Sequence, residues 1–290
     1  MRFAGKTAVI TGAVSGIGRA TVIKLAGEGA TVFAADIDEA GGAALAAASN
    51  GDVRFQRCDV THVPDIQALM DRAAAETGGI DIVFNNAAMV GDRAPIDEIS
   101  AEGWDQTMHL ILRSVAMGIR YAAPHMKGRP STTNGTASII NTASIAALGA
   151  GYSPTAYAVA KAGVLHLSKL AATDLAQHGI RVNAICPGFI NTNIFGQGLG
   201  IAAEHHDMVR AVVAEASQHA QPVARGGQPD DIANMVAFLA SAEASFITGT
   251  HMLVDGGITT GPRHAWDPDT PSMFEALLAM EEAAPTAGTA

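Results

Sequence analysis

Cysteine is scarce in this sequence, with Cys58 and Cys186 the only two among 290 residues. Two thiols cannot build the disulfide framework that is typical of small secreted proteins. Each cysteine ends an apolar run, so we expect both to be buried, reduced thiols of a cytoplasmic protein.

Charged residues are also few, at 16% of the chain, and the 18 Lys and Arg are outnumbered by 28 Asp and Glu. The formal net charge of −10 disfavours nucleic acid or an anionic membrane as a partner. Long apolar runs are missing as well. The first residues, Met1 to Lys6, lack the apolar stretch of a signal peptide, and no uncharged run is long enough to span a bilayer.

Short apolar runs alternate with helical patterns along most of the chain. The runs predict seven strands, at residues 7–10, 31–35, 53–57, 81–84, 137–141, 180–186 and 250–254. The segments between them predict helices at residues 20–28, 40–48, 64–76, 104–126, 154–178 and 229–239. Such alternation is typical of a parallel sheet. We therefore predict an α/β fold, a single Rossmann-type domain in which a doubly wound seven-stranded parallel sheet carries helices on both faces.

Glycines follow the first predicted strand. Gly12, Gly16 and Gly18 lie in the turn that leads from this strand into a helix. Glycines in such a turn let the backbone approach a pyrophosphate, and the helix N-terminus supplies free N–H groups. Asp36 ends the second strand, 18 residues after Gly18, near the spacing of a ribose-binding acid. A carboxylate there repels a 2′-phosphate and no Arg or Lys stands nearby, so we predict NAD and not NADP.

Tyr157 and Lys161 are four residues apart on a run that favours helix, so they share one helix face. A phenol beside a cation loses its proton more easily, and we expect the pKa of Tyr157 to fall from its usual value of about 10. Such a phenol is a usable acid/base near neutral pH. Ser144, 13 residues upstream, could hold the same substrate oxygen.

These features together resemble the short-chain dehydrogenase/reductase family, from Lys6 to about Gly257. The matching motifs are Thr11-Gly12-x-x-x-Gly16-x-Gly18, Asp59-Val60, Asn85-Asn86-Ala87, Ser144, Tyr157-x-x-x-Lys161 and Pro187-Gly188-x-x-x-Thr192. The resemblance implies that Ser144 orients the substrate oxygen, Tyr157 moves the proton, and Lys161 binds the nicotinamide ribose. It further implies that NAD is held by Gly12, Ser15, Gly16, Ile17, Gly18, Asp36, Ile37, Asp59, Val60, Asn86, Ala87, Thr142, Tyr157, Lys161, Pro187, Gly188, Ile190 and Thr192.

The chain departs from the family pattern at two positions. Ala88 stands where the family usually has a glycine, and Ile111 where it usually has a catalytic asparagine. That asparagine supports a local opening of its helix, where a main-chain carbonyl holds a water that meets the lysine. Since Ile111 keeps its carbonyl, we expect the opening to persist and the enzyme to be active.

By the same resemblance, residues 1–261 form the catalytic domain, with a substrate lid at about 189–228, irregular with helical patches. Phe189 and Phe195 are the expected substrate contacts, and no charged residue stands between Phe189 and Ala203. This favours a neutral, largely apolar secondary alcohol or ketone. His205-His206 resembles a metal pair, but we expect a solvated loop and no metal site, because adjacent helical residues do not share a face.

Residues 262–290 form a C-terminal extension. Within it, the segment from Met273 to Met280 can form two amphipathic turns, which we expect to pack with Trp266 over a substrate cleft or a neighbouring subunit. By family resemblance the chain is a homotetramer.

The sequence leaves the substrate, its stereochemistry and the direction of reaction open. We expect an NAD-dependent oxidoreductase. The alternatives are a cis-diol dehydrogenase using the same site, and a catalytically impaired NAD-binding regulatory protein, which Ile111 suggests.

Overall fold

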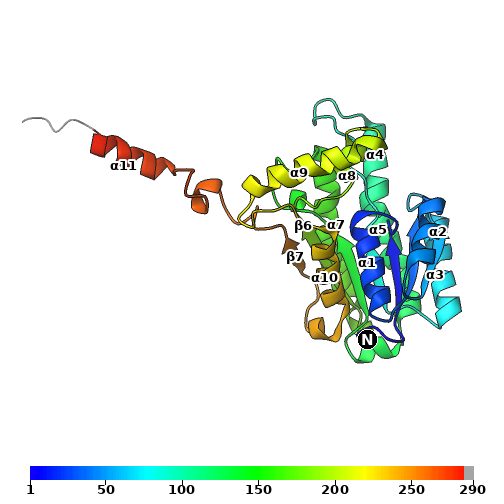
Figure 1. Ribbon diagram of the computed structural model, residues 1–290. Coiled ribbons are helices and arrows are strands. Elements are labelled where there is room, and N and C mark those ends of the chain that lie inside the picture. Colours follow the sequence, from blue (N-terminus) through cyan, green and yellow to red (C-terminus); the bar gives the residue numbers. More distant parts are fainter. Residues whose placement is uncertain (284–290) are drawn as a thin grey trace, which may run out of the picture.

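The structure is a computed structural model that describes residues 1–283. Its centre is a seven-stranded parallel sheet in the order β3-β2-β1-β4-β5-β6-β7 (Figure 1). The strands are β1 (Thr7–Thr11), β2 (Thr31–Asp36), β3 (Val53–Arg57), β4 (Ile82–Asn85), β5 (Ser138–Thr142), β6 (Arg181–Pro187) and β7 (His251–Val254). The predicted fold class is confirmed. The central strands could be recognised as continuous apolar runs because every residue of β1, β4, β5 and β6 is buried, as in a sheet that is covered on both faces.

Helices cover both faces of the sheet, and each face has its own apolar core. On one face α1 (Gly16–Gly27), α2 (Glu39–Ala48) and α10 (Pro229–Ala240) contribute Val22, Leu45 and Ile232. On the other face α3 (Val63–Thr77), α5 (Ser114–Met126) and α7 (Thr155–Leu175) contribute Leu69, Val115 and Val164. Local signals set the helix ends. Pro229 opens α10, where the Gln228 N–H donates to the Asp231 carboxylate at 2.7 Å, and Gly78 ends α3 with a φ of 80°.

The predicted long helix at residues 104–126 is interrupted. It consists of α4 (Ala101–Met108), a π-helical turn η1 (His109–Arg113) and α5, and the Ser114 N–H bonds to the His109 carbonyl five residues earlier. The expected opening of the helix at Ile111 is therefore present in the backbone. The Ile111 side chain is fully buried in the apolar core and packs in the same cluster as Ala160 and Val164 of α7.

The segment predicted to form a substrate lid is more regular than expected. It contains α8 (Ile194–Gly198), a 3₁₀ turn (Ala203–His205) and the 15-residue helix α9 (His206–Ala220). A further single turn, α6 (Pro130–Thr133), lies in the predicted loop before β5. In the extension, α11 (Met273–Ala283) confirms the predicted helix, while residues 284–290 lie outside the described residues. No helix in residues 1–283 combines the length and hydropathy needed to cross a bilayer.

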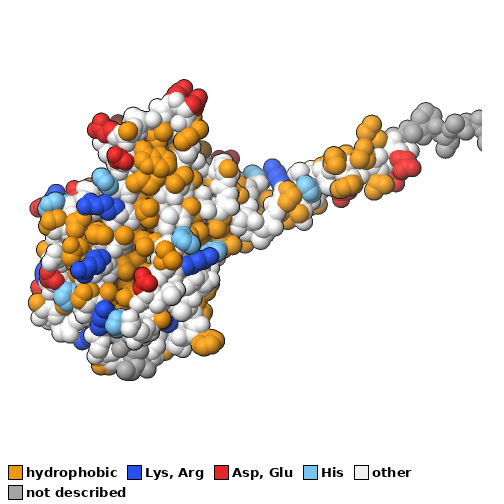
Figure 2. Space-filling view, turned by 180° about the vertical axis from the view of Figure 1, so that it is seen from behind, with side chains coloured by type: hydrophobic (Ala, Val, Ile, Leu, Met, Phe, Trp, Pro, Cys, Tyr) orange, Lys and Arg blue, Asp and Glu red, His pale blue; other side chains and the backbone are white. Residues whose placement is uncertain are grey.

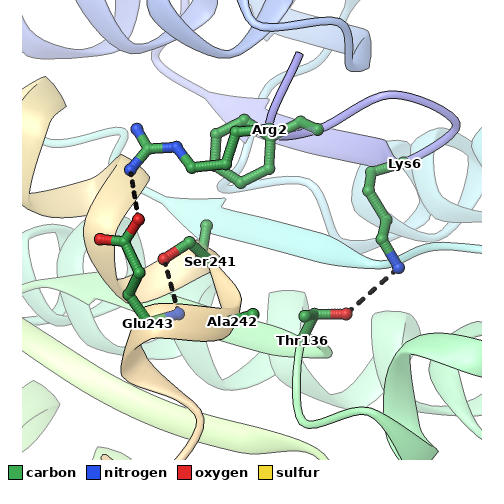
Figure 3. A pocket seen from close by; sticks show the side chains of 8 residues that line it. Arg2, Lys6, Thr136, Ser241, Ala242 and Glu243 are labelled. Carbon is green, nitrogen blue, oxygen red and sulfur yellow. Dashed lines mark hydrogen bonds and ion pairs between the residues drawn. The ribbon is translucent and has the colours of Figure 1, made fainter.

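The amino-terminal edge of the sheet is tied together by ionic contacts. The buried Asp81 carboxylate accepts from the Thr7 N–H at 2.9 Å and from Arg129 Nη2 at 2.9 Å, and lies 3.8 Å from Lys6 Nζ. A pocket of about 110 Å³ lies at this edge. Its lining is shown in Figure 3, where Lys6 Nζ donates to the Thr136 hydroxyl and Arg2 faces Glu243. This pocket lies at the opposite end of the strands from Ser144, Tyr157 and Lys161, so it has no part in their chemistry.

Substitution of Ile111 tests how the π turn is held. Ile111→Asn places an amide in a fully buried apolar site and is expected to cost about 1–3 kcal/mol of stability. Ile111→Val, which keeps the apolar character, is expected to cost about 0.5–1.5 kcal/mol. Urea unfolding of the three proteins measures both values. An asparagine variant as stable as the valine variant would mean that the π turn offers the amide partners, against this prediction.

Candidate active site

The predicted site residues gather at the carboxyl ends of the parallel strands. The glycine turn follows β1, Asp36 ends β2, and Asn86 and Ala87 follow β4. Ser144 follows β5, Pro187 ends β6, and α7 carries both Tyr157 and Lys161. Since parallel strands end at one edge of a sheet, residues up to 175 positions apart in the sequence (Gly12 to Pro187) share this edge.

Ser144 and Tyr157 interact directly through their hydroxyl groups. The two side chains form a hydrogen bond, and the Ser144 hydroxyl also accepts from the Ala146 N–H at 3.1 Å, which fixes its rotamer. Burial raises the pKa of Tyr157 to about 12, and the bond to Ser144 opposes part of this rise. The phenol is therefore protonated at neutral pH, with its hydroxyl held at a defined place.

Lys161 is buried, and its Nζ donates to the Thr142 carbonyl at 2.6 Å. Burial lowers the pKa of Lys161 to about 7. The Nζ lies 5.5 Å from the centroid of the Tyr157 ring, so the predicted neighbours are indeed adjacent. The expected downward shift of the Tyr157 pKa is nevertheless wrong for this structure. Desolvation opposes charge on both groups and is the largest cause of both shifts.

The glycine turn packs its own backbone tightly. A Cβ on Gly18 would lie 1.9 Å from the Gly12 carbonyl oxygen, and one on Gly12 would lie 2.8 Å from the Cα of Ala87. The Asn86 side chain joins the two segments by donating to the Thr11 carbonyl at 3.1 Å, and the Thr142 hydroxyl donates to Asn86 Oδ1 at 3.3 Å. Only glycine fits these positions, which leaves the N-terminus of α1 open to a pyrophosphate.

Asp36 lies against this turn. One carboxylate oxygen accepts from the Val14 N–H at 3.0 Å and the other from the Ile37 N–H at 2.8 Å. The Ile37 side chain beside it is 61% exposed, an apolar surface open to a ligand. The carboxylate is thus fixed where a ribose would meet it.

The expectation that no basic residue stands near Asp36 is wrong. Arg57 is the register partner of Asp36 across the β2–β3 pair. Its guanidinium lies 3.5 Å from the Glu39 carboxylate and 3.7 Å from that of Asp65. Arg57 and Asp36 are 21 residues apart in the sequence and become neighbours through the pairing register of β2 and β3. That register could not be seen in the sequence.

Asp59 and Val60 flank the next part of the edge. The Asp59 carboxylate accepts from the Thr61 N–H at 2.9 Å, and Val60 is buried. Val60 lines a small cavity of about 10 Å³ together with Thr11, Ile66, Asn85, Ala87, Ser114, Val115 and Gly118. Ser15 caps α1 without a side-chain bond to the helix, so its hydroxyl remains available, and Ile17 packs partly against the core.

The segment after β6 closes the other side of the glycine turn. A Cβ on Gly16 would lie 3.0 Å from the Thr192 methyl group, and Gly188 donates to the Val254 carbonyl at 3.0 Å. Ile190 forms an isolated parallel bridge with Gly227, which fixes the course of this segment. Thr192 therefore borders the turn. The expected role of Pro187, Gly188, Ile190 and Thr192 in positioning the nicotinamide stays a prediction.

Asn191 is a candidate that the sequence analysis missed. Its Oδ1 is buried and has no hydrogen-bond partner in the part of the chain that the structure describes. A buried amide oxygen without a donor is costly, and the carboxamide N–H₂ of a nicotinamide is a donor of the right kind. This orphaned oxygen and the glycine turn both fit a nicotinamide dinucleotide.

The lid begins with two aromatic residues in contact. The rings of Phe189 and Phe195 have centroids 6.1 Å apart. Beneath α8, the buried His206 has its Nε2 2.9 Å from the Ile201 carbonyl, and a Cβ on Gly196 would meet its ring at 2.6 Å. The prediction of a solvated His205-His206 loop is therefore wrong for His206, which packs α8 onto α9. Within the described residues, no group of His, Cys, Asp or Glu could hold a metal ion.

The chain is similar to known proteins over most of its length. Residues 12–259 match the family described as Enoyl-(Acyl carrier protein) reductase. The cis-4-hydroxycyclohexanecarboxylate dehydrogenase of Sinomonas cyclohexanicum is 38% identical over 89% of this chain and 98% of its own length. The 2,5-dichloro-2,5-cyclohexadiene-1,4-diol dehydrogenase of Sphingobium indicum is 36% identical over 88% and 97%. The 3beta-hydroxysteroid dehydrogenase 2 of Eggerthella lenta is 39% identical over 88% and 95%.

These matches agree with the sheet order and with the motifs at its carboxyl edge. A nicotinamide cofactor, NAD(P), serves this family, and the similar proteins act on hydroxyl-bearing carbons. The chain belongs to the short-chain dehydrogenase/reductase family and is a dehydrogenase that acts on CH–OH donors.

Proposed function

We propose that the protein oxidises neutral, largely apolar secondary alcohols with NAD, or reduces the corresponding ketones with NADH, and that Tyr157 is the acid/base. The observation that carries this proposal is the position of Tyr157, whose hydroxyl is hydrogen-bonded to Ser144 and whose ring centroid lies 5.5 Å from the buried Lys161 amine. NAD supplies the hydride acceptor for oxidation, and NADH the donor for reduction.

The protein's own residues handle the proton. In oxidation, Ser144 and Tyr157 hold the alcohol oxygen, and Tyr157, after losing its own proton, takes the hydroxyl proton as its phenolate while the carbinol carbon loses its hydride. In reduction, the protonated Tyr157 donates to the ketone oxygen, which its pKa of about 12 favours at neutral pH. The pKa of Lys161 is about 7, and the protonated lysine stabilises the negative charge of the Tyr157 phenolate. Oxidation of the alcohol by NAD releases one proton to the solvent, so alkaline pH favours this direction.

An alicyclic substrate is supported by two observations. The lid residues Phe189 and Phe195 pack ring against ring, and no charge occurs between Phe189 and Ala203. The names of the three relatives each place the hydroxyl on a ring: a cyclohexane, a cyclohexadiene and a steroid. Product identification with cyclic alcohols and diols tests this proposal. The diol alternative is supported by the Sphingobium relative alone, and predicts oxidation of ring diols but not of cyclohexanol.

We further infer that residues 1–261 are the catalytic unit, with the lid at 189–228 and the extension at 262–290, and that the enzyme is a homotetramer. Exposed apolar side chains such as Leu148, Val159 and Leu170, on α7 and the turn before it, support burial between subunits.

Replacing the proposed acid/base isolates its role. Tyr157→Phe removes the hydroxyl but keeps the ring, so turnover should fall by at least ~10²–10⁴-fold, the range of a general acid/base. NAD binding, followed by fluorescence titration, should be nearly unchanged. Turnover within a few-fold of the wild type would refute this assignment.

Cofactor choice depends on Asp36 and on the arginine opposite it. We expect the wild type to prefer NAD. Asp36→Ala should lower kcat/KM for NAD by about 10- to 100-fold, since a hydrogen bond to a charged group contributes about 1.5–3 kcal/mol. It should also admit NADP, because the repulsion between the Asp36 carboxylate and a 2′-phosphate is removed and Arg57, on the neighbouring strand, can attract that phosphate. The matched control is the double variant Asp36→Ala/Arg57→Ala, which should not show the increase in kcat/KM for NADP that is expected of Asp36→Ala. Equal kcat/KM for the two cofactors in the wild type would contradict this interpretation.

Burial of Lys161 should reduce the stability of the protein in a pH-dependent way. The pKa of this lysine is lowered to about 7 in the fold, so between about pH 7 and its unfolded value near 10.5 only the unfolded chain holds the proton. The destabilisation is therefore absent above this range and grows as the pH falls to about 7. Lys161→Met should abolish activity yet raise Tm, and by more at pH 7 than at pH 10.

The exposed Lys169 on the same helix provides the control, since Lys169→Met should give a Tm difference that does not change with pH. The Thr142 carbonyl loses its donor in Lys161→Met at every pH, so the comparison across pH cancels that effect. A Tm difference for Lys161→Met that is the same at pH 7 and pH 10 would contradict the shifted pKa.

A further inference from the structure

Helix α11 lies away from the body of the protein at the end of an arm (Figure 1). Five of its large apolar side chains are more than half exposed: Met273 at 68%, Phe274 at 71%, Leu277 at 54%, Leu278 at 59% and Met280 at 70%. Figure 2 shows hydrophobic side chains, in orange, along the arm. The expected helix is present, but it does not cover its own substrate cleft.

The arm holds its shape through its own hydrogen bonds. The Asp267 carboxylate accepts from Arg263 at 2.5 Å and from the Thr270 hydroxyl at 3.2 Å. Ser272 and Glu275 cap α11 reciprocally, with the Ser272 N–H on the Glu275 carboxylate at 2.6 Å and the Glu275 N–H on the Ser272 hydroxyl at 3.1 Å. Within the described chain, the hydrogen bonds and ion pairs of residues 261–283 all join two residues of that same segment.

An isolated helix of this kind is not stable in water. Helices shorter than ~12–15 residues are marginal alone, and α11 has 11 residues. Its apolar side chains leave little polar surface, which is provided mainly by Glu275, Glu281 and Glu282. A partner must therefore cover α11, and the turns from Arg263 to Ser272 direct the helix away from its own body.

The root of the arm lies beside a surface suited to self-association. The arm follows β7, the last strand of the sheet, whose outer edge has no strand partner among the described residues. Leu253 on β7 is 46% exposed, and Phe246, in the turn before β7, is fully exposed. A two-fold contact buries the same surface of both copies. If two copies met at their β7 edges in this way, the arm of each copy would lie on the body of the other.

We propose that α11 docks on a second copy of this chain, exchanged reciprocally across the β7 edge. The occupant of the apolar face of α11 is thus the body of the partner copy. This inference is independent of the proposed substrate and cofactor, because it rests on the arm and on the β7 edge.

Photo-crosslinking of the full chain tests the exchange. Cys58 and Cys186 are buried, so a benzophenone maleimide should label Leu277→Cys selectively. Irradiation should yield covalent dimers on a denaturing gel, with the second chain joined within residues 1–260. The matched control is Ile23→Cys, an exposed apolar position of α1, which should yield few or none.

A second measurement removes the apolar face and keeps the chain length. Leu277→Glu/Met280→Glu should raise the concentration at which the assembly dissociates by at least tenfold in mass photometry, whereas Ile23→Glu should not. Crosslinks confined to a single chain would show that α11 folds back on its own body and would overturn the proposal. Absence of crosslinked dimers together with an unchanged dissociation concentration would overturn it as well.

Discussion

The close approach of two backbones at the centre of the sheet constrains the rest of this structure. The glycine turn after β1 lies directly against Ala87 after β4, and a Cβ on Gly12 would reach 2.8 Å from its Cα. The strand order reverses at this point, between β1 and β4, where ligands of doubly wound sheets bind. Asn86 locks the contact through its bond to the Thr11 carbonyl and receives the Thr142 hydroxyl from β5. Positions of three strand ends are thereby fixed relative to one another before any ligand is considered.

The site at this edge contains two ionisable groups, Tyr157 and Lys161, whose charged forms are disfavoured by burial. Lys161 is buried, and its Nζ donates to the Thr142 carbonyl at the end of β5. The spacing of Tyr157 and Lys161 on one helix could predict that they are neighbours, because that follows from helical geometry. It could not predict the direction of the pKa shift, because the dielectric environment depends on what covers the helix. Burial of the Lys161 amine thus destabilises the fold. The same burial brings the pKa of this amine near neutrality, beside the phenol.

Other parts of the fold were predictable for equally physical reasons. The central strands read as apolar runs because both faces of the sheet are covered, and helix starts such as Pro229 carry local signals. Contacts set by register or by tertiary packing were not predictable. Arg57 stands opposite Asp36 through strand pairing, and His206 is buried because α8 folds over it. The missed Asn191 stood between two predicted residues, Ile190 and Thr192, yet only its orphaned oxygen in the folded chain distinguishes it.

The π turn shows how a sequence pattern can conceal a change in backbone. A single shift in hydrogen bonding from i+4 to i+5 leaves the apolar periodicity of residues 104–126 nearly intact, so the segment reads as one helix. The opening does not require an asparagine at position 111. The Ser114 hydroxyl donates to the Leu110 carbonyl one turn back, a bond that competes with the backbone ladder and tends to bend helices. The buried Ile111 side chain belongs to the same apolar cluster as Ala160 and Val164, which holds the turn by packing. The widened turn is thus maintained by Ser114 and by burial of Ile111, and the backbone carbonyls of the turn are retained whatever side chain stands there.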